Sequence, residues 1–95
     1  MGVAEGVETA LSAAYLFAIP VWAAVSAGSL AEWVPPDCAR RVTIFGDNDA
    51  SFTGQAAAFR LAQRLRAKGL KVQVDIPDPV DSDWNDILQQ TERAA

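Results

Sequence analysis

The sequence predicts an α/β domain in which about four mostly parallel strands form one sheet with helices on both faces. Short apolar runs alternate along the chain with segments whose apolar residues recur at helical spacing. Several of the short runs are apolar at consecutive positions, which is typical of strands that are covered on both faces. An alternation of strands and helices of this kind produces a parallel sheet. With 95 residues, the chain has room for one such domain.

The first half of the chain predicts a strand, a helix, a second strand and a short helix. Apolar residues spaced by three and four positions give the first helix one apolar face, formed by Leu11, Ala14, Tyr15 and Ala18. Because the first strand is very short, we expect the chain to be a domain excised from a larger, primase-like protein. In order, the four elements cover residues 2–4, 8–17, 21–25 and 29–33, and Ser29 caps the last of them.

The second half predicts the same alternation again. Its long helix has an apolar stripe for the core and, on another face, Arg60 and Arg64. Gly69 ends this helix, and either Ser82 or Asp83 caps the final one. In order, the four elements cover residues 41–45, 53–68, 71–76 and 84–91, and the tail from residue 92 is expected to fray.

The chain contains one cysteine and no histidine, and its net charge is −4. A zinc site built from Cys and His, a Ser-His-Asp triad and a Cys-His pair are therefore excluded within it. Cys38 is expected to be a buried or half-buried small apolar residue. A protein that grips nucleic acid over a wide surface is usually basic. Most of the affinity for nucleic acid would therefore come from a partner domain or a bridging metal ion.

No apolar run approaches the roughly 20 residues that a helix needs to cross a bilayer. The closest is segment 9–25, which Pro20 interrupts. A secretory signal would need a basic stretch near its start, and none is found there. We therefore expect a cytoplasmic protein that does not bind a membrane.

Acidic residues follow three of the predicted strands. In a parallel sheet the carboxyl ends of the strands share one edge, where ligands bind. Crowded carboxylates repel one another, and a divalent cation with oxygen ligands, most often Mg²⁺, offsets that repulsion. The pattern therefore predicts a metal site for chemistry on phosphate. The alternative for the middle pair is a turn that caps the next helix. The acids are Glu5 after the first strand, Asp47 and Asp49 after the third, and Asp83 and Asp86 after the fourth.

Three segments resemble the motifs of the Toprim domain, which bacterial-type primases, type IA and type II topoisomerases and several nucleases share. Residues 5–13 (EGVETALSA) resemble its glutamate motif in the form found in phage- and plasmid-type primases. Residues 45–49 (FGDND) and 54–57 (GQAA) resemble the Asp-x-Asp motif with its following helix, and residues 83–88 (DWNDIL) resemble the closing acidic motif. The resemblance implies a Rossmann-like α/β fold that binds one or two Mg²⁺ ions, with Mn²⁺ as a substitute.

The resemblance also implies a role for each acid. Glu5 matches the family glutamate, which is proposed there as general acid or base in nucleotidyl transfer. Asp47 and Asp49 match the magnesium ligands. Asp86 or Asp83 matches the third acidic position, and the sequence leaves both open.

Other residues are candidates for supporting roles. Glu8 and Asn48 would support the metal ligands, whereas the alternative for Glu8 is a first-turn acid favoured by the helix dipole. Arg60 and Arg64 would contact nucleic-acid phosphates, and their alternative is a solvated helix face. Trp84 lies in the closing motif and would stack on a base, unless it is a core residue. Further cations considered for phosphate contact are Arg40, Arg41, Lys68 and Lys71.

The resemblance implies a primase-like enzyme that synthesises RNA primers from nucleoside triphosphates on a single-stranded DNA template. Zinc-binding and helicase domains are its expected partners in the parent protein. A Toprim nuclease or topoisomerase-like strand cleaver is one alternative, although the only tyrosine, Tyr15, lies on an apolar helix face. A non-catalytic module that binds nucleic acid is another. The loop from Asp49 to Gly54 is longer than the usual family spacing, which puts the activity of the isolated domain in question.

Overall fold

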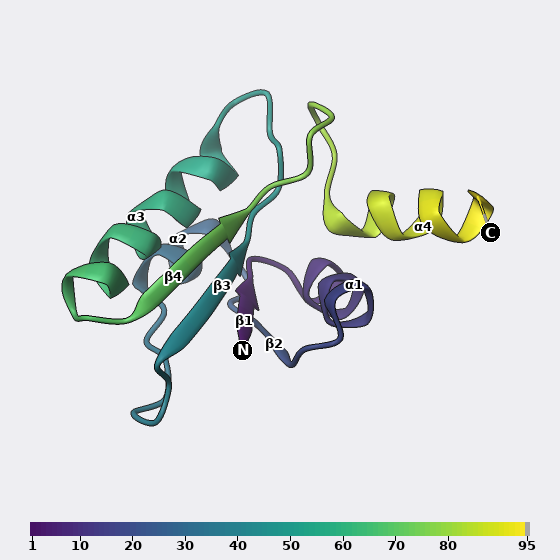
Figure 1. Ribbon diagram of the computed structural model, residues 1–95. Coiled ribbons are helices and arrows are strands. Elements are labelled where there is room, and N and C mark those ends of the chain that lie inside the picture. The colour runs from purple at the N-terminus through teal and green to yellow at the C-terminus, as the bar shows by residue number, and fades with distance from the viewer. Residues whose placement is uncertain (95) are drawn as a thin grey trace.

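The chain folds into a four-stranded parallel sheet with helices on both faces, which confirms the predicted α/β class (Figure 1). The computed structural model describes residues 1–94. Along the chain the elements are β1 (Gly2–Ala4), α1 (Val7–Phe17), β2 (Val21–Ala23), α2 (Ala27–Glu32), β3 (Arg41–Phe45), α3 (Thr53–Ala67), β4 (Lys71–Asp75) and α4 (Trp84–Ala94).

The strands lie in the order β2-β1-β3-β4, and each neighbouring pair is parallel. Ala4 at the end of β1 pairs with Phe45 at the end of β3, and Phe45 pairs with Asp75 at the end of β4. Because of this register, the three strands end together at one edge of the sheet. The residues that follow them therefore emerge side by side.

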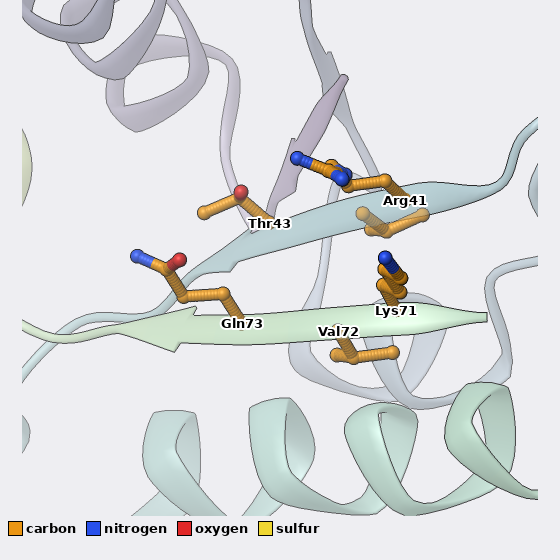
Figure 2. Close-up of a pocket in the computed structure, with 6 residues that line it drawn as sticks. Arg41, Thr43, Lys71, Val72 and Gln73 are labelled. Carbon is orange, nitrogen blue, oxygen red and sulfur yellow. The ribbon is translucent and has the colours of Figure 1, made fainter.

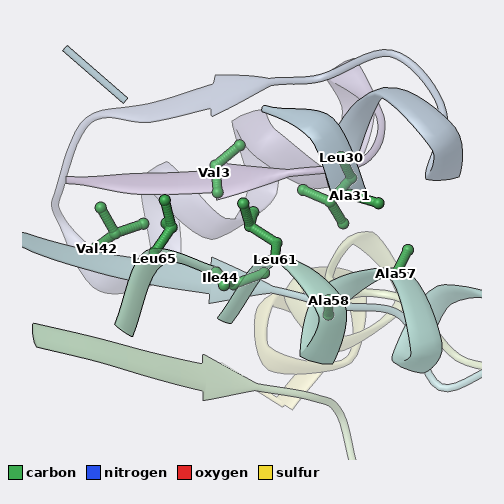
Figure 3. Packing of buried hydrophobic residues seen from close by; sticks show 9 residues of the cluster. All are labelled: Val3, Leu30, Ala31, Val42, Ile44, Ala57, Ala58, Leu61 and Leu65. Carbon is green, nitrogen blue, oxygen red and sulfur yellow. The ribbon is translucent and has the colours of Figure 1, made fainter. Parts of the chain in front are cut away.

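Large aliphatic side chains fill the space between the sheet and the layer formed by α2 and α3 (Figure 3). Apolar residues recur at helical spacing along α3, so that one side of this helix faces the sheet. Burying such side chains removes apolar surface from water and is the main stabilising contribution to a fold of this kind. The fully buried members are Val3, Leu30, Val42, Ile44, Ala58, Leu61 and Leu65.

The opposite layer, formed by α1 and α4, has a smaller and more alanine-rich core. Ala10 and Ala13 of α1 lie against Ala4 of β1. Trp84, the first residue of α4, packs edge-on against Phe45 with ring centroids 6.0 Å apart. Beyond this contact α4 lies against α1 and extends away from the sheet (Figure 1).

Most bounds follow the predicted ones closely, with three differences. β2 ends at Ala23, two residues early, and Val25 adopts a positive φ of 87° after it. The cap of α2 is Ser26, whose Oγ accepts a hydrogen bond from the Ser29 backbone N–H, so the prediction of Ser29 as the cap was wrong. The expected fraying from residue 92 was also wrong, because α4 continues to Ala94. Residue 95 lies outside the described residues.

The apolar face of α1 faces solvent. Leu11 and Tyr15 are 68% and 73% exposed, whereas Ala10, Ser12 and Ala13 are buried. The helix lies close over the short strand β1, and only small side chains fit between the two. Apolar periodicity therefore identified a real face of the helix, but this face is not part of the core.

The segment between α2 and β3 also departs from expectation, because Cys38 is exposed rather than buried. It lies in a turn in which the Ala39 backbone N–H donates to the Pro36 carbonyl over 2.9 Å.

Among the helices of residues 1–94, none has the length and apolar character needed to cross a membrane.

Candidate functional site

The acids predicted at the ends of β1 and β3 come together at one edge of the sheet. Because Ala4 pairs with Phe45, Glu5 and the loop from Asp47 to Asp49 leave the sheet next to each other. The negative charges of Glu5 and Asp49 both raise the pKa of Asp47, as expected of carboxylates held close together. The parallel register therefore assembles the centre of the predicted acidic site.

Asp47 has the strongly perturbed carboxyl group of this site. Its burial raises the pKa to about 6, and the charges of Asp83, Glu5 and Asp49 add to the shift in that order. The Thr9 hydroxyl donates to Asp47 Oδ1 over 3.4 Å and acts in the opposite direction. A group with this pKa exchanges its proton near neutral pH, where most aspartates are fully ionised.

Burial likewise raises the pKa of Glu5, and the charge of Asp49 raises it further. A hydrogen bond with the backbone of Ala27 has the opposite, smaller effect. Ala27 is the first residue of α2, so this helix positions the Glu5 carboxylate at the end of β1. Both carboxyl groups therefore bind protons more readily than ordinary surface acids do.

Asp49 fixes the start of α3. The N-cap position of this helix is Phe52, which has a φ of 63° and makes no side-chain cap. Asp49 replaces the missing cap, because its Oδ2 accepts a hydrogen bond from the Gly54 backbone N–H over 2.8 Å. A Cβ at Gly54 would lie only 2.5 Å from that oxygen, so glycine is required here for close approach. The capping role considered for this loop is therefore observed, and the metal-binding role of Asp49 stays a prediction.

The long loop after Asp49 folds back on itself. The Phe52 backbone N–H donates to the Asp49 carbonyl over 2.9 Å, and the Ala50 N–H donates to Asp81 Oδ1 over 3.0 Å. Asp49 consequently stays at the edge of the sheet despite the extra residues. The added length is accommodated in a surface turn whose Phe52 side chain is exposed.

Asn48 makes hydrogen bonds that hold the loop between β4 and α4 against the acidic loop. Its Nδ2 donates to the carbonyls of Pro77 and Asp78 over 2.8 and 2.9 Å. Its backbone N–H donates to the Ser82 carbonyl over 2.9 Å, and its Oδ1 accepts from Gln55 Nε2 over 3.1 Å. These bonds fix the path of the loop that leads to Asp83. Asn48 therefore holds two acidic segments together, and its support of metal ligands stays a prediction.

The two candidates for the third acidic position have different surroundings. Asp83 and Asp86 form a reciprocal cap at the start of α4, in which each carboxylate accepts a hydrogen bond from the backbone N–H of the other, over 2.8 and 3.0 Å. Asp83 is also the largest charged contributor to the raised pKa of Asp47, and Asp86 has no such effect. The geometry therefore favours Asp83 as the acid that faces Asp47.

Glu8 joins α1 to α4. Its Oε1 accepts a hydrogen bond from Asn85 Nδ2 over 2.9 Å, and Asn85 Oδ1 accepts from the Ser12 hydroxyl over 3.3 Å. Asn85 and Thr9 were not predicted as site residues, although both lie in the motif segments. The sequence signal that could have identified Thr9 was a hydroxyl side chain on the first turn of the helix that follows Glu5.

The predicted nucleic-acid contacts have varied environments. Arg64 Nη2 donates to the carbonyls of Ala31 and Trp33 over 2.9 and 2.5 Å, so this guanidinium binds the end of α2. Arg60 is exposed and lines a hollow of about 240 Å³ between α2 and α3. Trp84 packs edge-on against Phe17 as well as Phe45, which is the core alternative considered for it.

The donor set has the chemistry that Mg²⁺ prefers, since every candidate ligand is a carboxylate oxygen. Within residues 1–94, however, no three acidic or sulfur-containing side chains are close enough to hold one metal ion. Mg²⁺ commonly keeps several waters and binds through one or two carboxylates, so a wider arrangement also suits it. The candidates from which such a site would take its one or two carboxylate ligands are Asp47, Asp49 and Asp83.

The comparison with family models agrees with this arrangement. A model of the Toprim domain matches residues 1–94, which include every strand and every acid described above. No curated protein and no solved structure matches the chain. Toprim domains generally bind Mg²⁺ and catalyse nucleotidyl or phosphoryl transfer. The chain therefore belongs to the Toprim domain family.

Proposed function

We propose that this Toprim domain catalyses nucleotidyl transfer in RNA primer synthesis on a single-stranded DNA template. The observation that supports this function is the group of four carboxylates at the edge of the sheet, whose mutual repulsion and burial raise the pKa of Asp47 to about 6. Repulsion of this kind is relieved when a cation binds, and nucleotidyl transfer requires a cation to neutralise phosphate.

Each acid has a separate part in the proposal. Asp47, Asp49 and Asp83 would hold Mg²⁺, which when bound neutralises charge on phosphate oxygens and aligns the reacting groups. Glu5 would accept the proton of the attacking 3′ hydroxyl, and because burial raises its pKa this carboxylate is a stronger base than an ordinary surface glutamate. Thr9 positions Asp47 through its hydroxyl, and Asn48 positions the segment that ends in Asp83.

A metal titration tests the proposed site. In amide NMR of the metal-free chain, Mg²⁺ should shift signals around residues 5–6, 47–49 and 83–86. Asp47→Asn should weaken binding by roughly tenfold or more, since even the loss of a group that supports a ligand has effects of that size. Asp37→Asn, at an exposed position between α2 and β3, is the matched control and should leave affinity unchanged. The absence of shifts at millimolar Mg²⁺ would overturn the proposal.

A product assay separates the proposed reaction from its alternatives. The chain is incubated with Mg²⁺, nucleoside triphosphates and a single-stranded DNA oligonucleotide, and new RNA is the expected product. Shortening of the oligonucleotide would assign the domain to the Toprim nucleases instead. Metal binding without either product would indicate a binding module, and the same assay with primase zinc-binding and helicase domains added would show whether they are required.

A further inference from the structure

One face of the sheet at β3 and β4 is polar, and it is separate from the acidic edge. Val42 and Ile44 of β3 and Val72 of β4 pack toward α3, so the alternating residues point to the other side. Figure 2 shows Arg41, Thr43 and Gln73 on the side of the strands away from the helix, whereas Val72 points toward it. A hollow of about 270 Å³ lies along these two strands. We call this surface the β3–β4 polar face, and it consists of Arg41, Thr43, Lys71 and Gln73.

Two cations lie directly opposite each other on this face. Arg41 pairs with Lys71 in the strand register, and both side chains are exposed. Like charges at directly opposed positions destabilise a sheet. The only acid on these two strands is Asp75, four residues beyond Lys71, and its carboxylate accepts hydrogen bonds from Gln73 Nε2 over 2.9 and 3.1 Å. An anion bound between Arg41 and Lys71 would relieve their repulsion.

The face leads to the acidic edge. β3 runs from Arg41 to Phe45, and Asp47 follows two residues later. At about 3.3 Å per residue, the paired cations lie roughly 13 Å from the end of the strand. Thr43, which pairs with Gln73, lies in the interval and offers a hydroxyl as a hydrogen-bond donor. The polar groups therefore form a line that ends at the proposed catalytic acids.

We propose that the β3–β4 polar face binds the backbone of single-stranded DNA and directs the strand toward the acidic edge. This inference rests on the proposed nucleotidyl-transfer function, because it is that reaction which brings a polynucleotide to the edge. Arg41 and Lys71 bind a backbone phosphate, and the Thr43 hydroxyl donates to the sugar–phosphate chain nearer the acids. None of the four residues is aromatic, so binding depends on phosphate charge rather than base stacking and has little sequence preference.

The test measures DNA binding without metal. Fluorescence anisotropy of a labelled oligothymidylate is recorded in EDTA over roughly 50 to 300 mM salt for the natural chain and for the double variant Arg41→Gln/Lys71→Gln. Each phosphate contact contributes about −0.7 to the slope of log affinity against log salt for a single strand. We therefore expect the double variant, which loses one phosphate contact, to have a slope shallower by about 0.7 and a lower affinity at low salt. Arg93→Gln, near the end of α4, removes an exposed cation of the same kind and should change neither.

Three results would overturn the inference. They are an unchanged slope in the double variant, an equal loss in the Arg93→Gln control, and no binding by the natural chain at low salt. Thermal melting shows whether the double variant is folded, and relief of the like-charge pair should leave its stability unchanged or raised. A Mg²⁺ titration of the same variant separates the two proposals. A DNA-binding defect with normal metal shifts supports the polar face, whereas absent metal shifts in the natural chain count against the proposed function alone.

Discussion

The two helical layers of this domain differ in what they contribute. The layer of α2 and α3 buries leucine and alanine side chains against valine and isoleucine side chains of the sheet, whereas the layer of α1 and α4 buries mainly alanines and one aromatic cluster. The second layer provides Thr9, Glu8 and Asp83 to the acidic site and its surroundings. One layer thus supplies most of the stability, while the other holds functional groups with smaller packing contacts.

The largest expected effect is a loss of stability on truncation of a buried side chain in the α2/α3 layer. Leu61 is fully buried between α3 and the sheet, so Leu61→Ala leaves a cavity. Losses of about 2–5 kcal/mol are typical of such substitutions. Urea unfolding measures the change in the free energy of unfolding. A loss below about 1 kcal/mol would show that the α2/α3 layer does not dominate stability.

A smaller loss of stability is expected from removal of the Asn48 side chain, which hydrogen-bonds the loop between β4 and α4 to the acidic loop. Asn48→Ala removes three side-chain hydrogen bonds, to Pro77, Asp78 and Gln55. We expect a loss of about 2 kcal/mol, because a net contribution near 1 kcal/mol per bond is reduced by partial exposure. Hydrogen exchange should rise in residues 77–83 while α3 stays protected. Uniform loss of protection across both layers would contradict the local role of Asn48.

A gain in stability is expected from Asp47→Asn in metal-free solution. The folded pKa of Asp47 is raised to about 6, so its contribution to stability is complete below the unfolded pKa and is lost as pH rises through about 6. Asparagine cannot ionise, and the variant should exceed the natural chain by about 1 kcal/mol at pH 7 after allowance for solvent screening. Near pH 4 the difference should vanish. Urea unfolding at both pH values, in EDTA, measures it, and destabilisation at pH 7 would indicate a structural role instead.

The smallest effect is expected on the outer face of α1. Leu11→Ala truncates the same side chain as Leu61→Ala, but Leu11 is 68% exposed. The change in the free energy of unfolding should stay within about 0.5 kcal/mol, as is usual at the surface. Under the same urea protocol, a loss comparable to that of Leu61→Ala would mean that Leu11 is buried in solution.

Some features of the fold and of the acidic site were predictable from the sequence. β3 was predicted over its full extent, because Val42, Ile44 and Phe45 form a short apolar run and the acidic loop marks its end. The meeting of Glu5 with the acids after β3 followed from the shared edge of a parallel sheet. These features depend on local pattern and on the rules of strand connection.

Features set by tertiary contacts were not predictable in this way. Periodicity defined an apolar face on α1, but only the close approach of β1 shows that alanines face inward. Asn85 binds Ser12 across 73 positions of sequence, and Arg64 binds carbonyls more than 30 positions away. The choice between Asp83 and Asp86 depended on the path of the loop that Asn48 fixes. Contacts between residues so far apart in the sequence leave no local pattern from which they could be predicted.

The central claim is that the carboxylates at the edge of the sheet form one electrostatically coupled site for a divalent cation. Carbon-detected NMR of the Asp47 carboxyl group across the pH range, with and without Mg²⁺, tests it most directly. We expect an apparent pKa of about 6 in metal-free solution and a shift to lower pH on addition of Mg²⁺, because the cation favours the ionised form. Titration at the ordinary value for aspartate, with no response to Mg²⁺, would contradict the claim.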